Sequence, residues 1–140
     1  MKSEILFHQL FEPETSTYTY IIADKKTKEA AIIDPVIEMV DRDLKLIEEL
    51  GVNLKFILDT HIHADHITAA AEIRKRTKAK TGVSVEAEIS VLDIALSDGQ
   101  ELLLGDKKIK VIATPGHTNT CLSYYFEGFV FTGDALLIRG

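Results

Sequence analysis

The chain has little cysteine, no excess of positive charge and no long hydrophobic run. Its single cysteine, Cys121, cannot form a disulfide within the chain, so a disulfide-stapled scaffold is excluded and a reducing, cytoplasmic location is expected. The net charge of -6 provides no basic surface for nucleic acid or for an anionic membrane. No apolar run approaches the length that spans a bilayer. We therefore expect neither nucleic acid nor a membrane among the partners.

The rest of the composition is that of a soluble globular protein. Hydrophobic residues make up 46% of the chain and charged residues 27%. The segment from Met1 to His8 lacks the apolar core of a signal peptide and the Arg-rich character of a transit peptide. A length of 140 residues suits one domain, which we expect to span residues 1–140.

The hydrophobic pattern predicts a β-hairpin, a helix, a strand, a second helix and then a β-rich second half. The expected strands are residues 18–23, 30–34, 54–58, 82–85, 101–104, 108–113, 122–126 and 129–131, and the expected helices are residues 40–50, ended by Gly51, and 66–78. Residues 89–96 stay open between strand, helix and loop. This order is typical of an α/β layered protein with a mixed sheet.

A cluster of imidazoles follows the apolar strand at residues 54–58. The segment Thr60-His61-Ile62-His63-Ala64-Asp65-His66 contains three of the five histidines and a carboxylate, and it leads directly into the second helix. Two histidines separated by one residue in a loop can point at one metal ion, and the carboxyl edge of a sheet is where α/β proteins present such groups. A solvated polar loop is the alternative, but four possible ligands within six residues argue for a metal site.

Two further segments end strands in the same way. Thr114-Pro115-Gly116-His117-Thr118 follows the strand at 108–113 and leaves His117 at a sharp turn. Thr132-Gly133-Asp134-Ala135 follows the strand at 129–131, and Gly133 permits close approach of the backbone to Asp134. Each segment alone is a weak signal. Together with the histidine loop they predict one shared site.

These segments resemble the metallo-β-lactamase superfamily, and within it the persulfide dioxygenase branch. The matching segments are Phe11-Glu12-Pro13, Ile33-Asp34-Pro35-Val36, Thr60-His61-Ile62-His63-Ala64-Asp65-His66-Ile67-Thr68 and Phe131-Thr132-Gly133-Asp134-Ala135-Leu136-Leu137-Ile138-Arg139-Gly140. The resemblance covers nearly the whole chain and separates it from the glyoxalase II thioesterases. It implies the N-terminal portion of an αββα sandwich, with a mixed β-sheet and flanking helices.

The resemblance also implies a metal and a reaction. The implied ligands of one mononuclear, non-haem Fe(II) per chain are His61, His117 and Asp134. The side chains that would orient these ligands, or bind a second metal as in the zinc hydrolases, are His63, Asp65 and His66. Two imidazoles and one carboxylate leave positions open for O2 and substrate. The implied activity is the oxidation of glutathione persulfide by O2 to sulfite and glutathione.

Two other functions stay open, and the length of the chain bears on them. One alternative is a zinc-dependent, glyoxalase II-like thioester hydrolase, and the other is a non-catalytic metal-binding fragment. Because the relatives continue beyond Gly140, the resemblance implies a C-terminally truncated chain whose strands at 108–113 and 129–131 expose apolar side chains. Exposed apolar surface promotes association, so a homo-oligomer is expected. Cys121 is expected to be a buried packing residue.

Overall fold

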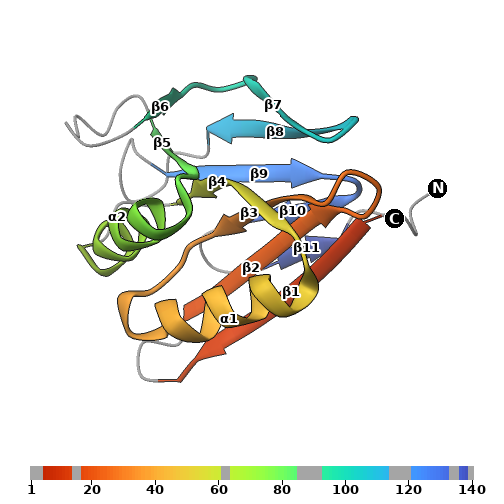
Figure 1. The fold of residues 1–140 in the computed structure, drawn as a ribbon. Coiled ribbons are helices and arrows are strands. Elements are labelled where there is room, and N and C mark those ends of the chain that lie inside the picture. The colour runs from red at the N-terminus through yellow and green to blue at the C-terminus, as the bar shows by residue number, and fades with distance from the viewer. Residues whose placement is uncertain are drawn as a thin grey trace.

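The computed structural model describes residues 5–13, 17–60, 64–84, 93–113, 121–132 and 136–138. In these residues two β-sheets pack face to face, and two α-helices cover the outer face of the first sheet (Figure 1). The helices are α1 (Val40–Leu50), which follows the short 3-10 helix η2 (Ile37–Met39), and α2 (Ala64–Thr77). Neither helix is both long enough and apolar enough to cross a membrane.

The first sheet contains six strands in its described part, in chain order across the sheet. They are β1 (Ile5–Glu12), β2 (Thr17–Asp24), β3 (Glu29–Ile33), β4 (Asn53–Leu58), β5 (Lys80–Ser84) and β6 (Ile94–Leu96). The pairs β1–β2 and β2–β3 are antiparallel, whereas β3–β4, β4–β5 and β5–β6 are parallel. The sheet is therefore mixed, and α1 and α2 lie in the crossovers from β3 to β4 and from β4 to β5.

The second sheet is antiparallel throughout its described strands, in the order β11-β10-β9-β8-β7. They are β7 (Glu101–Leu104), β8 (Lys107–Ala113), β9 (Leu122–Phe126), β10 (Phe129–Phe131) and β11 (Leu136–Ile138). Since β8 and β10 both pair antiparallel with β9, they run in the same direction and end at the same edge of this sheet.

Alternating side chains divide the interior into two apolar clusters. On β4, Phe56 and Leu58 point to the cluster between the two sheets, and Ile57 points to the cluster under the helices. The largest fully buried side chains of the inter-sheet cluster include Tyr20, Tyr124, Phe126 and Phe131. The first sheet is thus buried on both faces, as expected for a sheet with parallel strands.

Most of the predicted elements are confirmed. Helix α1 ends at Gly51, whose φ of 69° provides the left-handed cap. Helix α2 and strand β5 each begin two residues earlier than predicted, at Ala64 and Lys80. The sequence did not indicate β1 or β11, and it left residues 89–96, which include β6, open between strand, helix and loop. Strand β1 is an edge strand without a clean alternation of burial, and β6 and β11 are only three residues long, so tertiary pairing determines all three.

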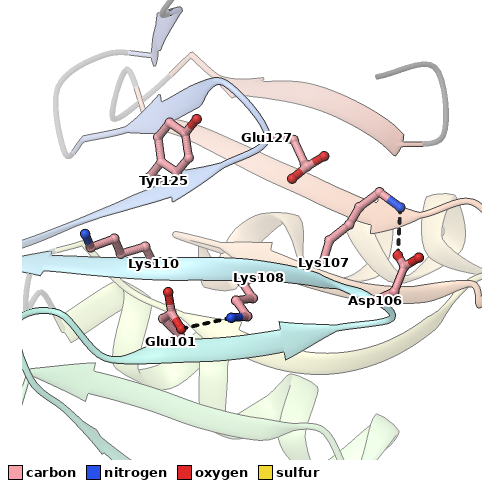
Figure 2. A pocket seen from close by; sticks show the side chains of 7 residues that line it. All are labelled: Glu101, Asp106, Lys107, Lys108, Lys110, Tyr125 and Glu127. Atoms are coloured by element: carbon pink, nitrogen blue, oxygen red, sulfur yellow. Dashed lines mark hydrogen bonds and ion pairs between the residues drawn. The ribbon is translucent and has the colours of Figure 1, made fainter. Parts of the chain in front are cut away.

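The observed exposure of side chains in the second half of the chain differs from two expectations. On β8 the apolar Ile109 and Val111 are buried, and the outward side chains are Lys108 and Lys110, so the expected exposed apolar face is wrong for this strand. Figure 2 shows the charged pocket on this side, with the ion pair between Lys108 and Glu101 at 3.4 Å. Cys121 is partly exposed, so the prediction of a buried cysteine is also wrong. The expected homo-oligomer stays a prediction.

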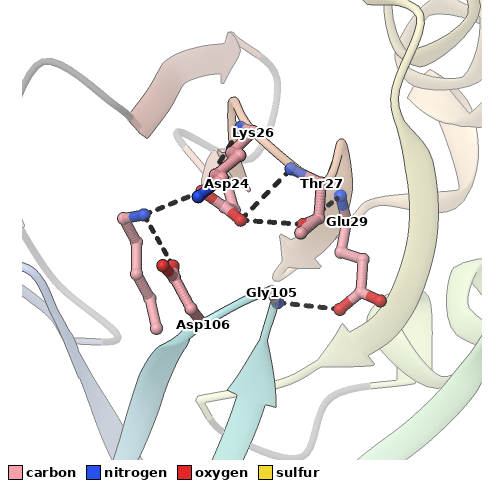
Figure 3. A network of polar contacts seen from close by, with 7 residues as sticks. Asp24, Lys26, Thr27, Glu29, Gly105 and Asp106 are labelled. Atoms are coloured by element: carbon pink, nitrogen blue, oxygen red, sulfur yellow. Dashed lines mark hydrogen bonds and ion pairs between the residues drawn. The ribbon is translucent and has the colours of Figure 1, made fainter.

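A polar network joins the turn between β2 and β3 to the turn between β7 and β8 (Figure 3). The Lys107 ammonium donates to the buried Asp24 carboxylate at 2.7 Å and lowers the pKa of Asp24 to about 2. Thr27 donates to the same carboxylate through its hydroxyl at 2.8 Å. The backbone N–H of Gly105 donates to Glu29 Oε1 at 2.8 Å. These contacts tie the two sheets together at one edge of the sandwich.

The network predicts a specific penalty for a side chain at Gly105. This glycine has a φ of 66°, and a Cβ there would collide with the Asp24 carboxylate and with Thr27 Oγ1. Gly99 has a similar φ of 84° but open space around it, so Gly99→Ala is a matched control that measures the backbone cost of about 1–2 kcal/mol. In urea titrations Gly105→Ala should lose at least about 1 kcal/mol more, because the clash adds to that cost. Equal losses would contradict the described packing.

Helix α1 carries a buried carboxyl group. Asp43 is fully buried, and its Oδ1 accepts a hydrogen bond from Arg42 Nε at 3.0 Å. Its Oδ2 has no hydrogen-bond partner among the described residues. Burial raises the pKa of Asp43 to about 6, against the opposing effect of the Arg42 guanidinium. The ionised form is therefore disfavoured in the folded chain.

Asp43→Asn should stabilise the protein at pH 7 by about 1–3 kcal/mol, because it removes a charge that folding buries. In the wild type only the unfolded chain ionises at this position between pH 3.8 and about 6, so the free energy of unfolding should fall as pH rises through that window. Denaturant titrations from pH 4 to 7 should show this slope reduced in Asp43→Asn. The exposed Asp41→Asn in the same helix is the control, and an equal effect there would refute the assignment.

Candidate metal centre

The structure describes the strands next to the predicted metal ligands, whereas most of these ligands lie outside the described residues. The predicted ligands outside the described residues are His61, His63, His117 and Asp134. Asp65 and His66 lie in the first turn of α2, and the positions of their side chains are not described. Within the described part of the chain, no three His, Cys, Asp or Glu side chains gather closely enough to bind a metal. The ligand set therefore stays a prediction from the sequence.

The strands that lead into the three predicted ligand segments end at one edge of the sandwich. Strands β8 and β10 end there side by side with the start of β9, because Ala113 pairs with Leu122 and Phe131 pairs with Tyr124. The end of β4 joins them directly, since the Leu122 N–H donates to the Thr60 carbonyl at 2.6 Å. We call this edge, where β4, β8 and β10 end, the carboxyl edge.

Asp34 connects three segments at the carboxyl edge. Its carboxylate accepts hydrogen bonds from the backbone N–H of Thr60 at 2.7 Å and from the Thr60 hydroxyl at 2.6 Å. Its own N–H donates to the Leu58 carbonyl at 2.8 Å, and its carbonyl accepts from the Thr19 hydroxyl at 2.8 Å. Asp34 adopts a positive φ of 57°, which is uncommon for a residue with a side chain. This arrangement fixes the backbone immediately before His61.

A second buried carboxyl group, that of Asp59, lies near Asp34. Asp59 is buried, and its Oδ1 has no hydrogen-bond partner among the described residues. Burial raises the pKa of Asp59 well above the ordinary value, and the nearby Asp34 carboxylate raises it further. The Tyr124 hydroxyl donates to the Asp59 carbonyl at 2.6 Å. Burial also raises the pKa of Tyr124, with Asp59 and Asp34 adding to the effect.

The sequence reasoning did not assign roles to these supporting residues. Asp34 follows a strand and precedes Pro35. Asp134 was predicted as a ligand because it also follows a strand, so the same signal was available for Asp34. Asp59 and Thr60 directly precede His61, so their proximity in sequence was a second signal. Nothing in the sequence pointed to Tyr124, since its partner lies 65 residues away in the chain.

Comparison with known proteins places the chain in a family. The family model described as the metallo-beta-lactamase superfamily matches residues 13–140. The chain belongs to the metallo-β-lactamase superfamily. The two described sheets and the two helices on one face form part of the αββα sandwich of that fold, as the sequence predicted.

Within the superfamily the chain is similar to persulfide dioxygenases. It is 40% identical over 138 residues to the human persulfide dioxygenase ETHE1, mitochondrial, covering 97% of this chain and 54% of the human protein. The crystal structure of ETHE1 from Myxococcus xanthus matches with a TM-score of 0.87 and 47% identity, covering 96% of this chain and 60% of that one. A hydroxyacylglutathione hydrolase from Cereibacter sphaeroides is 32% identical over 130 residues, covering 90% of this chain and 50% of the hydrolase. The chain thus spans about half the length of these curated relatives.

The Asp34–Thr60 contact predicts how two substitutions at Thr60 will differ. Thr60→Val keeps the side-chain shape but removes the hydroxyl bond to a carboxylate, so the free energy of unfolding should fall by about 1.5–3 kcal/mol. Thr60→Ser keeps the hydroxyl and removes one methyl group, which should cost about 1 kcal/mol or less. Urea titration of both variants measures the difference. A serine variant as unstable as the valine variant would show that the hydrogen bond contributes little.

Proposed function

We propose that this chain acts as a persulfide dioxygenase, which oxidises glutathione persulfide with O2 at a mononuclear Fe(II) site. The observation that supports this most strongly is the 47% identity and TM-score of 0.87 to ETHE1 from Myxococcus xanthus across nearly the whole chain. One persulfide, one O2 and one water would yield one glutathione, one sulfite and two protons. The similarity to the human persulfide dioxygenase supports the same substrate class.

The described residues are chemically compatible with a metal at the carboxyl edge. Asp59 Oδ1 is buried without a hydrogen-bond partner among the described residues, and Asp59 lies two positions before His61. A buried carboxylate next to ligating histidines commonly accepts the proton of an imidazole nitrogen that does not bind the metal. The residues proposed to hold the iron are His61, His117 and Asp134. Bound there, Fe(II) would supply the redox chemistry between O2 and the persulfide sulfur.

The chain's own contribution is to hold the ligand segments in place and to keep the region beneath them dry. Asp34 fixes the backbone of Thr60 directly before His61, through bonds of 2.6 and 2.7 Å. Leu58 and Tyr124 are buried below this backbone, so water does not compete for its hydrogen bonds. A pre-organised backbone lowers the cost of arranging the ligands and the substrate.

The proposal predicts unequal effects for substitutions among the six site residues. His117→Ala and Asp134→Ala should each abolish stoichiometric iron and reduce the oxygen uptake with glutathione persulfide by more than about 100-fold, because each removes a metal ligand. His63→Ala should retain some iron and lose about 10–100-fold in rate, as expected for a residue that orients ligands. An oxygen electrode and a sulfite assay, with iron analysis of each variant, measure these effects.

The alternative of a zinc-dependent thioester hydrolase is supported by the similarity to the hydroxyacylglutathione hydrolase. It predicts hydrolysis of a glutathione thioester with zinc and no oxygen uptake, and equal loss of metal in all three variants. Iron binding without turnover would instead indicate a metal-binding fragment. Either result would overturn the proposed oxidation by this chain.

A further inference from the structure

We propose that Tyr124 is a positioning residue. Its hydroxyl fixes the segment after β4, which carries His61, relative to the segments before β9 and after β10, which carry His117 and Asp134. This inference rests on the proposed function, because it assigns Tyr124 a part in metal binding. The hydroxyl donates to the Asp59 carbonyl at 2.6 Å, and the side chain is fully buried. It is a side-chain bond from the second sheet to the end of a strand in the first.

The backbone before His61 is held from both sides. From the second sheet, Tyr124 bonds the Asp59 carbonyl and the Leu122 N–H bonds the Thr60 carbonyl, both at 2.6 Å. From the first sheet, the Asp34 carboxylate bonds the Thr60 N–H at 2.7 Å. Two consecutive carbonyls thus accept hydrogen bonds from one strand, β9, and the orientation of both peptide groups follows from the position of that strand.

The location of Tyr124 relates this contact to the other predicted ligands. Tyr124 is the middle residue of β9, and this strand follows the segment that contains His117. In the β9–β10 register Tyr124 pairs with Phe131, three positions before Asp134. The hydroxyl therefore links the segment that carries His61 to the strand pair from which the other two ligands extend. A metal bound by all three is sensitive to shifts of a few tenths of an ångström between these segments.

A purely packing role is the competing explanation, since Tyr124 belongs to the apolar cluster between the sheets. Phenylalanine would satisfy that role fully. Tyr124→Phe keeps the ring and leaves the Asp59 carbonyl without this donor, so it separates the two explanations. The matched control is Tyr20→Phe, which removes the hydroxyl of another buried tyrosine in the same cluster.

Two measurements on the wild type, Tyr124→Phe and Tyr20→Phe test the proposal. The first is amide hydrogen exchange of Thr60 and Leu122 in the metal-free chain, where Tyr124→Phe should exchange about 10-fold faster than the wild type. The second is an anaerobic Fe(II) titration, where Tyr124→Phe should raise the dissociation constant about 10–100-fold. Tyr20→Phe should change neither, although urea titration should show a similar loss of stability in both variants.

The outcomes distinguish this inference from the proposed function. A wild-type chain that binds no iron would refute the proposed function, and faster exchange in Tyr124→Phe alone would then still support the positioning role. If Tyr124→Phe matches the wild type in exchange and affinity, or if Tyr20→Phe causes equal changes, Tyr124 is a packing residue and the inference is wrong.

Discussion

The hydrogen bonds from Thr60 to the Asp34 carboxylate are the interaction on which the carboxyl edge depends. Both are short, both are buried, and the acceptor is a carboxylate, so each is stronger than a bond between neutral groups. Without them a backbone N–H would be buried unsatisfied at the end of β4, which costs about 1–3 kcal/mol. The left-handed backbone of Asp34 is compatible with the fold because four hydrogen bonds hold that residue in place.

The sandwich is therefore joined at two edges by different chemistry. At the carboxyl edge, the backbone N–H and the hydroxyl of Thr60 donate to the buried Asp34 carboxylate, and the Tyr124 phenol donates to the backbone carbonyl of Asp59. In the network of Figure 3, the Lys107 ammonium neutralises the buried Asp24 and connects the turns of the two sheets. Among the described residues, two buried carboxyl oxygens have no hydrogen-bond partner, namely Asp59 Oδ1 at the carboxyl edge and Asp43 Oδ2 in α1.

Local sequence patterns were sufficient to predict the helices and strands whose formation depends on neighbouring residues in the chain. The helix ended by Gly51 and the apolar strand β4 were predicted within one residue, because a left-handed cap and a doubly buried strand leave clear signals. Edge strand β1 was missed because its order comes from pairing with β2. The supporting network was missed because Tyr124 and Asp59 are distant in sequence. The partly exposed Cys121 was predicted to be buried because cysteine is usually buried and residue 121 precedes a strand. The ligand assignment itself depends on family resemblance.

Elemental analysis of the wild-type chain, purified anaerobically without added chelator, tests the central claim most directly. The claim is that strand ends fixed by Asp34 present the ligands of a single metal ion. The account predicts about one iron per chain, since two imidazoles and one carboxylate form a mononuclear site that suits Fe(II). Two zinc ions per chain, or no bound metal after reconstitution with Fe(II), would contradict it.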